Sequence, residues 1–189
     1  MSGRPAIFLD RDGTLNPDPG YISRPEDFEL FPGTGEALAR LRAAGYLLVV
    51  VTNQSGVARG IIPPDALERI HDKMSRELSR SGAAPDAIYI CPHHPDHPPA
   101  GQPAGTSCGC RKPEPGLVLR AIAELGIDPA ASWAVGDRMT DVRMALAAGV
   151  APVLIMQERP RDLPESVPCV PDLAGAVDRI LGGPQPNRL

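Results

Sequence analysis

The sequence predicts an α/β protein whose parallel sheet is covered by helices on both faces. Short apolar runs rich in strand-forming side chains alternate along the chain with segments whose apolar residues recur every three or four positions. The order strand, helix, strand appears first across residues 6–51. Because strands that alternate with helices are joined by crossover connections, this pattern is typical of a doubly wound parallel sheet.

Five short apolar runs are predicted to be strands. Each is too short for a buried helix, and β-branched and aromatic side chains, which favour strands, are common in them. The first run ends at Asp10 and the second ends at Thr52. In chain order the predicted strands are residues 6–9, 46–51, 87–90, 133–135 and 152–155.

Four segments between these runs are predicted to be helices. Leu38 and Leu41 keep helical spacing in the first, and Ile70 and Met74 do so in the second. A glycine directly follows three of the four segments, at the position that suits a helix C-cap. In chain order the predicted helices are residues 35–44, 65–80, 115–125 and 140–148.

The length of 189 residues fits one domain, and the sequence shows no repeat and no linker. We therefore expect a single domain over residues 1–189. Residues 92–109 are rich in Pro, Gly and His and too irregular for a strand or helix, which predicts a long functional loop. Residues 182–189 contain Gly-Gly-Pro and are expected to be a frayed tail.

Composition and charge exclude several classes of protein. With 42% hydrophobic and 22% charged residues the chain is in the globular range. A net charge of −4 provides no general basic surface for a nucleic-acid backbone, so we expect no nucleic-acid partner. The longest apolar run, residues 46–51, is far shorter than the ~20 residues that span a bilayer, and no signal-peptide pattern opens the chain. We expect a soluble cytoplasmic monomer without a membrane partner.

Charged and hydroxyl side chains follow several predicted strands directly. Asp10 and Asp12 follow the first strand, Thr52 follows the second, and Asp137 follows the fourth. The carboxyl ends of parallel strands meet at one edge of a sheet, so these groups are expected to lie close together with Lys112. Paired carboxylates, a hydroxyl and a cation are what phosphoryl transfer needs, although each residue singly is better explained as a cap or a solvated charge.

Four motifs in this order resemble those of the haloacid dehalogenase (HAD) superfamily of phosphohydrolases. They are Asp10-x-Asp12-Gly13-Thr14, Thr52-Asn53, Lys112-Pro113 and Gly136-Asp137-x-x-x-Asp141. Over roughly residues 6–156, the segments 10–16, 20–21, 51–60, 91–94 and 108–113 are similar to the heptose 1,7-bisphosphate 7-phosphatase family within it. The resemblance implies a HAD-like Rossmannoid parallel sheet without a large cap domain.

The resemblance implies a role for each motif residue. Asp10 corresponds to the nucleophile, Asp12 to the general acid and base, and Thr52 and Lys112 to the groups that hold the transferring phosphoryl group. Mg²⁺ would be held by Asp10, the backbone carbonyl of Asp12 and Asp137, with Asp141 either supporting this cluster or only capping a helix. The corresponding substrate contacts are Asp18, Pro19, Gly20, Tyr21, Asn53, Gln54, Ser55, Arg111 and Arg138, the last standing where the family is expected to have lysine.

The predicted loop also carries four soft metal ligands at residues 91–110. Cys91, His93, Cys108 and Cys110 provide three thiolates and one imidazole, a closed tetrahedral set for a structural Zn²⁺. His94 and His97 are possible substitutes for His93, but the Cys-Pro-His spacing of the family favours His93. Outside the loop, His71 lies beside the apolar stripe of a helix and is expected to be a packing or surface histidine.

The activity implied by the resemblance is Mg²⁺-dependent removal of the C7 phosphate of D-glycero-D-manno-heptose 1,7-bisphosphate through an aspartyl-phosphate. This hydrolase would act on a small sugar bisphosphate in ADP- or GDP-heptose biosynthesis for lipopolysaccharide. One alternative is the related histidinol-phosphate phosphatase of histidine biosynthesis. The other is a zinc-organised binding module without catalysis, which the intact acidic residues and the acidic net charge disfavour.

Overall fold

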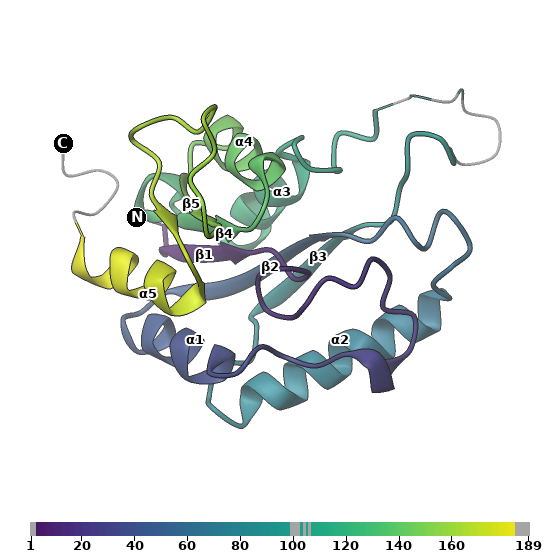
Figure 1. Cartoon of the computed structure of the whole chain (residues 1–189), viewed down its shortest axis with the longest axis horizontal. Helices are drawn as coiled ribbons and strands as arrows, with labels where there is room; N and C mark the ends of the chain where they lie inside the picture. Colours follow the sequence, from purple (N-terminus) through teal and green to yellow (C-terminus); the bar gives the residue numbers. More distant parts are fainter. Residues whose placement is uncertain (1–2, 99–102, 104, 106, 184–189) are drawn as a thin grey trace.

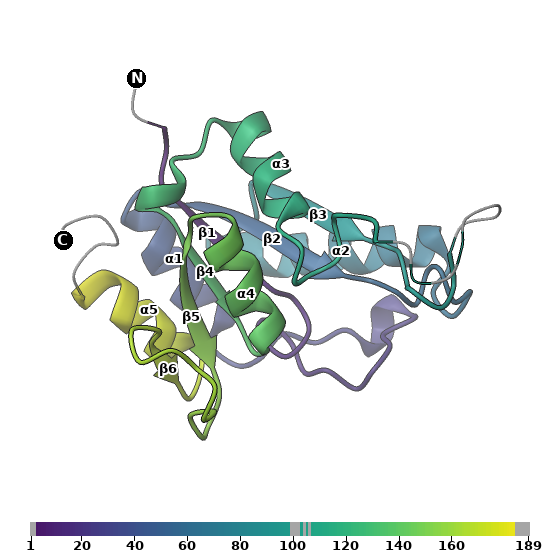
Figure 2. The same ribbon diagram turned by 90° about the horizontal axis from the view of Figure 1, so that it is seen from above.

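The computed structural model describes residues 3–98, 103, 105 and 107–183. Six parallel strands form one sheet in the order β3-β2-β1-β4-β5-β6 (Figure 1; β6 is labelled in Figure 2). β1 lies at its centre, where Phe8 is paired with Val49 on one side and with Ala134 on the other. The strands are β1 (Ala6–Leu9), β2 (Leu47–Asn53), β3 (Ala87–Cys91), β4 (Trp133–Gly136), β5 (Ala151–Ile155) and β6 (Cys169–Val170).

Helices cover both faces of this sheet, as predicted. α1, α2 and α5 lie on one face, and α3 and α4 lie on the other (Figures 1 and 2). The helices are α1 (Thr34–Ala43), α2 (Pro64–Ser79), α3 (Gly116–Leu125), α4 (Met139–Ala147) and α5 (Leu173–Gly182), with short 3₁₀ helices η1 (Pro25–Asp27) and η2 (Pro129–Ala131).

The central strand shows why the sequence forms a two-faced core. Successive strand residues point to opposite faces, and all four residues of β1 are buried. Ile7 and Leu9 pack in the cluster under α1, α2 and α5, whereas Ala6 and Phe8 pack in the cluster under α3 and α4. Because both faces are covered, the strand is a continuous apolar run rather than an alternating one.

The five predicted strands and four predicted helices are all present, with ends that differ by at most two residues. No element is predicted after residue 155, whereas the structure adds β6 and α5. α5 carries a readable signal, because Asp172 caps its N-terminus and its buried Leu173, Val177 and Ile180 keep helical spacing. The predicted frayed tail needs correction at its start, since Gly182 is the last residue of α5; residues 184–189 lie outside the described residues.

The connections that flank the sheet edge are loops. Between β1 and α1 the only regular element is η1, and the described part of the segment from β3 to α3 contains none. Within the described residues there is thus no large cap domain, in agreement with the prediction. None of the described helices combines the length and the apolar character needed to cross a membrane.

Candidate active site

The polar residues that follow the strands line one cavity at the carboxyl end of the sheet. Its volume is about 380 Å³. The walls are formed by Asp10, Asp12, Asp18, Gly20, Tyr21, Thr52, Asn53, Gln54, Ser55, His94, Arg111, Lys112, Arg138, Thr140 and Asp141. The structure therefore brings together nearly all residues that the sequence singled out. Two residues predicted for this site, Pro19 and Asp137, do not line the cavity. Pro19 is exposed, and Asp137 lies in the acidic cluster described next.

Three carboxylates, of which Asp10 and Asp141 are buried and Asp137 is half-buried, form an acidic cluster beside β1 and β4. Oxygen atoms of Asp10, Asp137 and Asp141 lie within 4.8 Å of one another. Two glycines make this approach possible. A Cβ atom on Gly13 would lie 2.3 Å from Oδ2 of Asp137, and one on Gly136 would lie 2.3 Å from Cγ of Asp141. Such a set of oxygen donors suits Mg²⁺, so the residues fit the metal that the sequence predicts.

Lys112 is the buried cation of the site. Its Nζ lies 2.6 Å from Oδ1 of Asp10 and 2.7 Å from Oδ1 of Asp141, and it donates to the carbonyl of Val51 at 3.0 Å. Burial by itself would lower the pKa of Lys112, but the two carboxylates raise it above its usual value. The ammonium group therefore stays charged and available to phosphoryl oxygens.

Asn53 fixes the backbone of Lys112. Its Oδ1 accepts from the backbone N–H of Lys112 at 3.1 Å, and its Nδ2 donates to the carbonyl of Lys112 at 3.3 Å. The amide predicted to contact substrate is thus also the group that positions the lysine. Sequence reasoning missed this pairing because the two residues are 59 positions apart.

The acidic cluster carries more negative charge than Lys112 can balance. Burial raises the pKa of Asp10 to about 7; Lys112 opposes this shift, while Asp141 and Asp137 add to it. Burial, followed by the charge of Asp141, also raises the pKa of Asp137. A divalent cation would relieve this excess of buried negative charge.

Asp12 accepts a dense set of hydrogen bonds. Nη2 of Arg11 lies 2.8 Å from both of its oxygens, and Nε of Arg11 lies 3.0 Å from Oδ1. Asn16 donates to Oδ1 at 3.0 Å and Gln54 donates to Oδ2 at 2.8 Å. Because the same Gln54 amide also donates to the Thr52 hydroxyl at 2.9 Å, it links two of the predicted catalytic groups.

The rim of the cavity is formed by cations and one acidic residue. Arg138 is paired with Asp18 and lies 3.7 Å from Oδ2 of Asp137. The backbone N–H of Arg138 donates to Asp141 at 3.1 Å, so Asp141 both caps α4 and belongs to the acidic cluster. Arg111 donates to the carbonyl of His93 at 3.3 Å. His94 and Thr140 also line the cavity, although the sequence analysis did not place them there.

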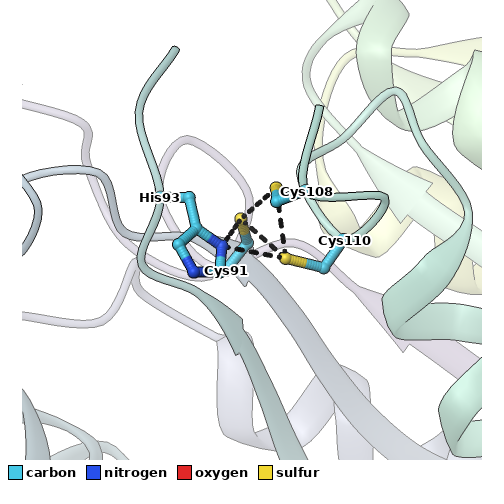
Figure 3. Close-up of side chains that lie close together, drawn as sticks. All are labelled: Cys91, His93, Cys108 and Cys110. Carbon is cyan, nitrogen blue, oxygen red and sulfur yellow. Dashed lines mark hydrogen bonds between the residues drawn. The ribbon is translucent and has the colours of Figure 1, made fainter. Parts of the chain in front are cut away.

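A second cluster of metal-ligating side chains lies where β3 ends. Cys91, His93, Cys108 and Cys110 point toward one another (Figure 3), and their ligand atoms all lie within 4.8 Å. The three pairs of sulfur atoms are 3.1–3.6 Å apart, and Nδ1 of His93 lies 3.3 Å from the sulfur of Cys110. Sulfur atoms bound tetrahedrally to one zinc at ~2.3 Å would be ~3.8 Å apart, so a modest outward adjustment would accommodate the ion.

His94 and His97 are not members of this cluster. Nδ1 of His94 accepts from the backbone N–H of Asp96 at 3.1 Å, and the two imidazole rings pack edge to face at 5.3 Å. Of the three histidines near Cys91, His93 is the one whose ring nitrogen lies with the three cysteine sulfur atoms. Arg111 and Lys112 follow Cys110 directly, so the cluster lies next to the cations of the cavity.

Comparison with known proteins finds relatives that are named as phosphatases. Residues 109–175 match the HAD-hydrolase-like family. A D-glycero-beta-D-manno-heptose-1,7-bisphosphate 7-phosphatase of Photorhabdus laumondii is 44% identical over 82% of the chain and 81% of the relative. The enzyme of the same name from Escherichia coli K12 is 40% identical over 94% of the chain and 88% of the relative.

A solved structure is similar over nearly the same span. D,D-heptose 1,7-bisphosphate phosphatase from B. bronchiseptica, in complex with magnesium and phosphate, is 38% identical with a TM-score of 0.82. The alignment covers 94% of this chain and 98% of that one.

Proposed function

We propose that this chain, which belongs to the D-glycero-beta-D-manno-heptose-1,7-bisphosphate 7-phosphatase family, removes the C7 phosphate of a heptose 1,7-bisphosphate. The observation that carries this proposal is the buried contact of Asp10 with Lys112 beside two further carboxylates. That arrangement offers a nucleophile, a cation for phosphoryl oxygens and ligands for a metal. Phosphoric monoester hydrolysis through an aspartyl-phosphate uses these three parts.

In the first step Asp10 attacks the phosphorus atom of the C7 ester. A bond forms between a carboxylate oxygen of Asp10 and phosphorus, and the bond from phosphorus to the sugar oxygen breaks. The leaving oxygen takes its proton from Asp12, which lines the same cavity. Thr52 and Lys112 hold the phosphoryl oxygens during the transfer. The product of this step is an aspartyl-phosphate and a free sugar hydroxyl.

In the second step water attacks the phosphorus atom of the aspartyl-phosphate. Asp12, now a carboxylate, accepts a proton from that water, and the bond between phosphorus and Asp10 breaks. Inorganic phosphate leaves, and Asp10 returns as a carboxylate. The hydrogen bonds from Asn16 and Gln54 keep Asp12 directed into the cavity for both proton transfers.

Mg²⁺ would be held by Asp10, the backbone carbonyl of Asp12 and Asp137. When bound, it neutralises negative charge on the phosphoryl oxygens and on the acidic cluster. Asp141 supports this arrangement, because it is paired with Lys112 and caps the N-terminus of α4. The magnesium and phosphate bound to the similar B. bronchiseptica enzyme support this assignment.

The Cys/His cluster would hold Zn²⁺ with a structural role. Cys91, His93, Cys108 and Cys110 supply four protein ligands, which leaves no open position for a substrate or water. The cluster joins the end of β3 to the segment that carries Arg111 and Lys112. The zinc would therefore stabilise the loop that places both cations.

The second phosphate of the substrate would be bound by Arg111. A phosphoryl group at Asp10 uses Lys112 and Thr52, whereas Arg138 is already paired with Asp18. Arg111 lines the same cavity, where its Nη1 donates to the backbone carbonyl of His93. Nε and Nη2 can therefore bind an anion in bidentate fashion. A bisphosphate would therefore place one phosphoryl group at Asp10 and the other at Arg111.

We further propose that the protein acts as a cytoplasmic monomer in ADP- or GDP-heptose biosynthesis. A cavity of about 380 Å³ suits a small sugar phosphate rather than a macromolecule. The large apolar side chains exposed among the described residues come from different segments of the chain: Phe31 precedes α1, Leu119 lies in α3 and Leu146 lies in α4. This dispersal along the chain supports a monomer. Light scattering coupled to size exclusion tests the oligomeric state.

The proposed function is tested by comparing kcat/KM for the heptose 1,7-bisphosphate, the heptose 7-phosphate and histidinol phosphate. We expect the bisphosphate to be the best substrate, because the binding energy of its unreactive phosphate holds the C7 ester in line with Asp10. Asp10→Asn should abolish turnover, because an amide cannot attack phosphorus. Histidinol phosphate as the best substrate, or an active Asp10→Asn protein, would contradict the proposal.

Arg111→Ala separates the two phosphate sites. Loss of a charge-assisted contact of about 1.5–3 kcal/mol should lower kcat/KM for the bisphosphate by about 10–100-fold. The heptose 7-phosphate, which lacks the second phosphate, should lose much less. A loss of the same size on both substrates would show that Arg111 does not bind the second phosphate.

A further inference from the structure

Arg11 lies between the two carboxylates of the first motif and is almost fully buried. Its side chain is 1% exposed. Nε and Nη2 are directed at Asp12, as described above. A buried guanidinium group has five N–H donors and is costly wherever a donor lacks a partner. The remaining nitrogen, Nη1, therefore needs an acceptor from another part of the fold.

That acceptor is His71 of α2. Its Nε2 lies 3.1 Å from Nη1 of Arg11, and the residue is buried. Arginine has no acceptor atom, so Nε2 of the imidazole must accept and the ring proton must lie on Nδ1. Burial and the adjacent Arg11 lower the pKa of His71 to about 4, which agrees with a neutral ring. His71 is thus a hydrogen-bonding partner rather than the packing or surface histidine that the sequence predicts.

The helix that carries His71 is packed into the core of the protein. Ile70 and Met74, its neighbours on α2, have no exposed surface and pack in the core cluster under the sheet. Arg11, in contrast, lies in the loop that leaves β1. The chain of contacts from α2 through His71 and Arg11 to Asp12 therefore ties the general acid to the core.

We infer that His71 is a positioning residue, which acts through Arg11 to hold the Asp12 carboxyl group where it protonates the leaving oxygen. The inference rests on the proposed function, in which Asp12 is the general acid. It has a consequence that a packing role lacks. Removing His71 should impair proton donation to the leaving group more than the attack by Asp10 or the binding of substrate.

Leaving groups of different basicity make this distinction measurable. Phenyl phosphate and p-nitrophenyl phosphate have similar shapes, but phenolate is the more basic leaving group and depends more on a general acid. For both esters kcat/KM reports the steps up to the first irreversible one, the transfer to Asp10 in this mechanism. The ratio of the two kcat/KM values therefore measures proton donation by Asp12.

The experiment compares His71→Leu, His71→Gln and Met74→Leu with the wild-type protein. We expect His71→Leu to lower kcat/KM for phenyl phosphate by about tenfold, part of the ~10²–10⁴-fold that a general acid contributes, and for p-nitrophenyl phosphate by much less. His71→Gln supplies an acceptor and should restore most of the loss. Met74→Leu, a packing change one turn along the same helix, should leave the ratio of the two values unchanged.

Arg11→Lys serves as a second probe if His71→Leu fails to fold. Lysine keeps the positive charge but cannot hydrogen-bond to Asp12 and His71 at the same time in the geometry of the guanidinium group. Arg11→Lys should therefore also lower kcat/KM more for phenyl phosphate than for p-nitrophenyl phosphate. Equal losses on both esters, no loss, or a His71→Gln protein no better than His71→Leu would overturn the inference. Failure of the proposed function looks different, because Asp10→Asn would then retain activity whatever the His71 variants do.

Discussion

Asp10 is acted on by charges of both signs, from Lys112 and from two neighbouring carboxylates. It is buried beside Asp137 and Asp141, and its only buried counter-charge among the contacts described is Lys112 at 2.6 Å. Burial raises its pKa to about 7, so near neutral pH a proton and a metal ion compete for the same carboxylate. Nucleophilic attack needs the carboxylate form, which bound Mg²⁺ favours by its charge.

We expect Mg²⁺ affinity to rise with pH between about 6 and 7 and to level off above pH 8. Below a pKa of about 7 Asp10 carries a proton that Mg²⁺ must displace, so the affinity should increase up to about tenfold per pH unit there. Above that pKa no proton remains to be displaced. Calorimetric titration in two buffers of different ionisation enthalpy measures the protons released. An affinity independent of pH, with no proton release at pH 6, would contradict this expectation.

The residues of the site lie at or just beyond the carboxyl ends of the strands. Gly13 lies in the turn after β1 and Gly136 is the last residue of β4, and both leave room for a carboxylate of the acidic cluster. Gly136 has no positive φ, so its backbone conformation does not require glycine. Glycine is needed there because a side chain would not fit. A Cβ atom there would meet both Cβ and Cγ of Asp141, at 2.4 Å and 2.3 Å, so rotation of that side chain cannot relieve the overlap.

Gly136→Ala should therefore displace the start of α4 and weaken the acidic cluster. Overpacking of this kind costs about 1–3 kcal/mol, and we expect kcat to fall at least tenfold with a higher Mg²⁺ requirement. Gly182→Ala is the matched control, because no atom lies near its added Cβ. Magnesium-dependent phosphate release and thermal unfolding measure both effects. A Gly136→Ala protein with wild-type magnesium dependence would show that this spacing is unimportant.

At the scale of the whole molecule, the Cys/His cluster connects two distant segments. Cys91 ends β3, whereas Cys108 and Cys110 directly precede the cations of the cavity. Burial raises the pKa of the Cys91 thiol, so without a cation its thiolate is unfavourable. A bound Zn²⁺ would supply that cation and would couple the stability of the loop to the placement of Lys112.

The purified protein should contain about one zinc per chain by elemental analysis. Cys110→Ser should lose the zinc, lower Tm by about 5–10 °C and reduce activity, because the loop that carries Arg111 and Lys112 is released. Cys169→Ser is the control, since that cysteine lies in β6 outside the cluster and should keep the zinc. Wild-type protein that carries no zinc after growth with zinc available would rule out this interpretation.

The sequence by itself determined the order of the elements through β5, the edge of the sheet at which the polar residues gather and the two groups of candidate metal ligands. These features are local. An apolar run that ends at Asp10 or Thr52 marks both a strand and its functional end, and the spacing of Cys91, His93, Cys108 and Cys110 shows a donor set directly. β6 remained unpredicted because its two residues pair only with β5 and carry no periodicity of their own.

Only the tertiary structure decided which polar residues act as partners. Asn53 bonds the backbone of Lys112, and His71 bonds Arg11 across 60 positions of sequence. Nothing in the neighbouring residues of His71 distinguishes it from a packing histidine, because its partner is a donor supplied by another element. Hydrogen bonding depends on distance and direction in space, which periodicity along the chain does not encode.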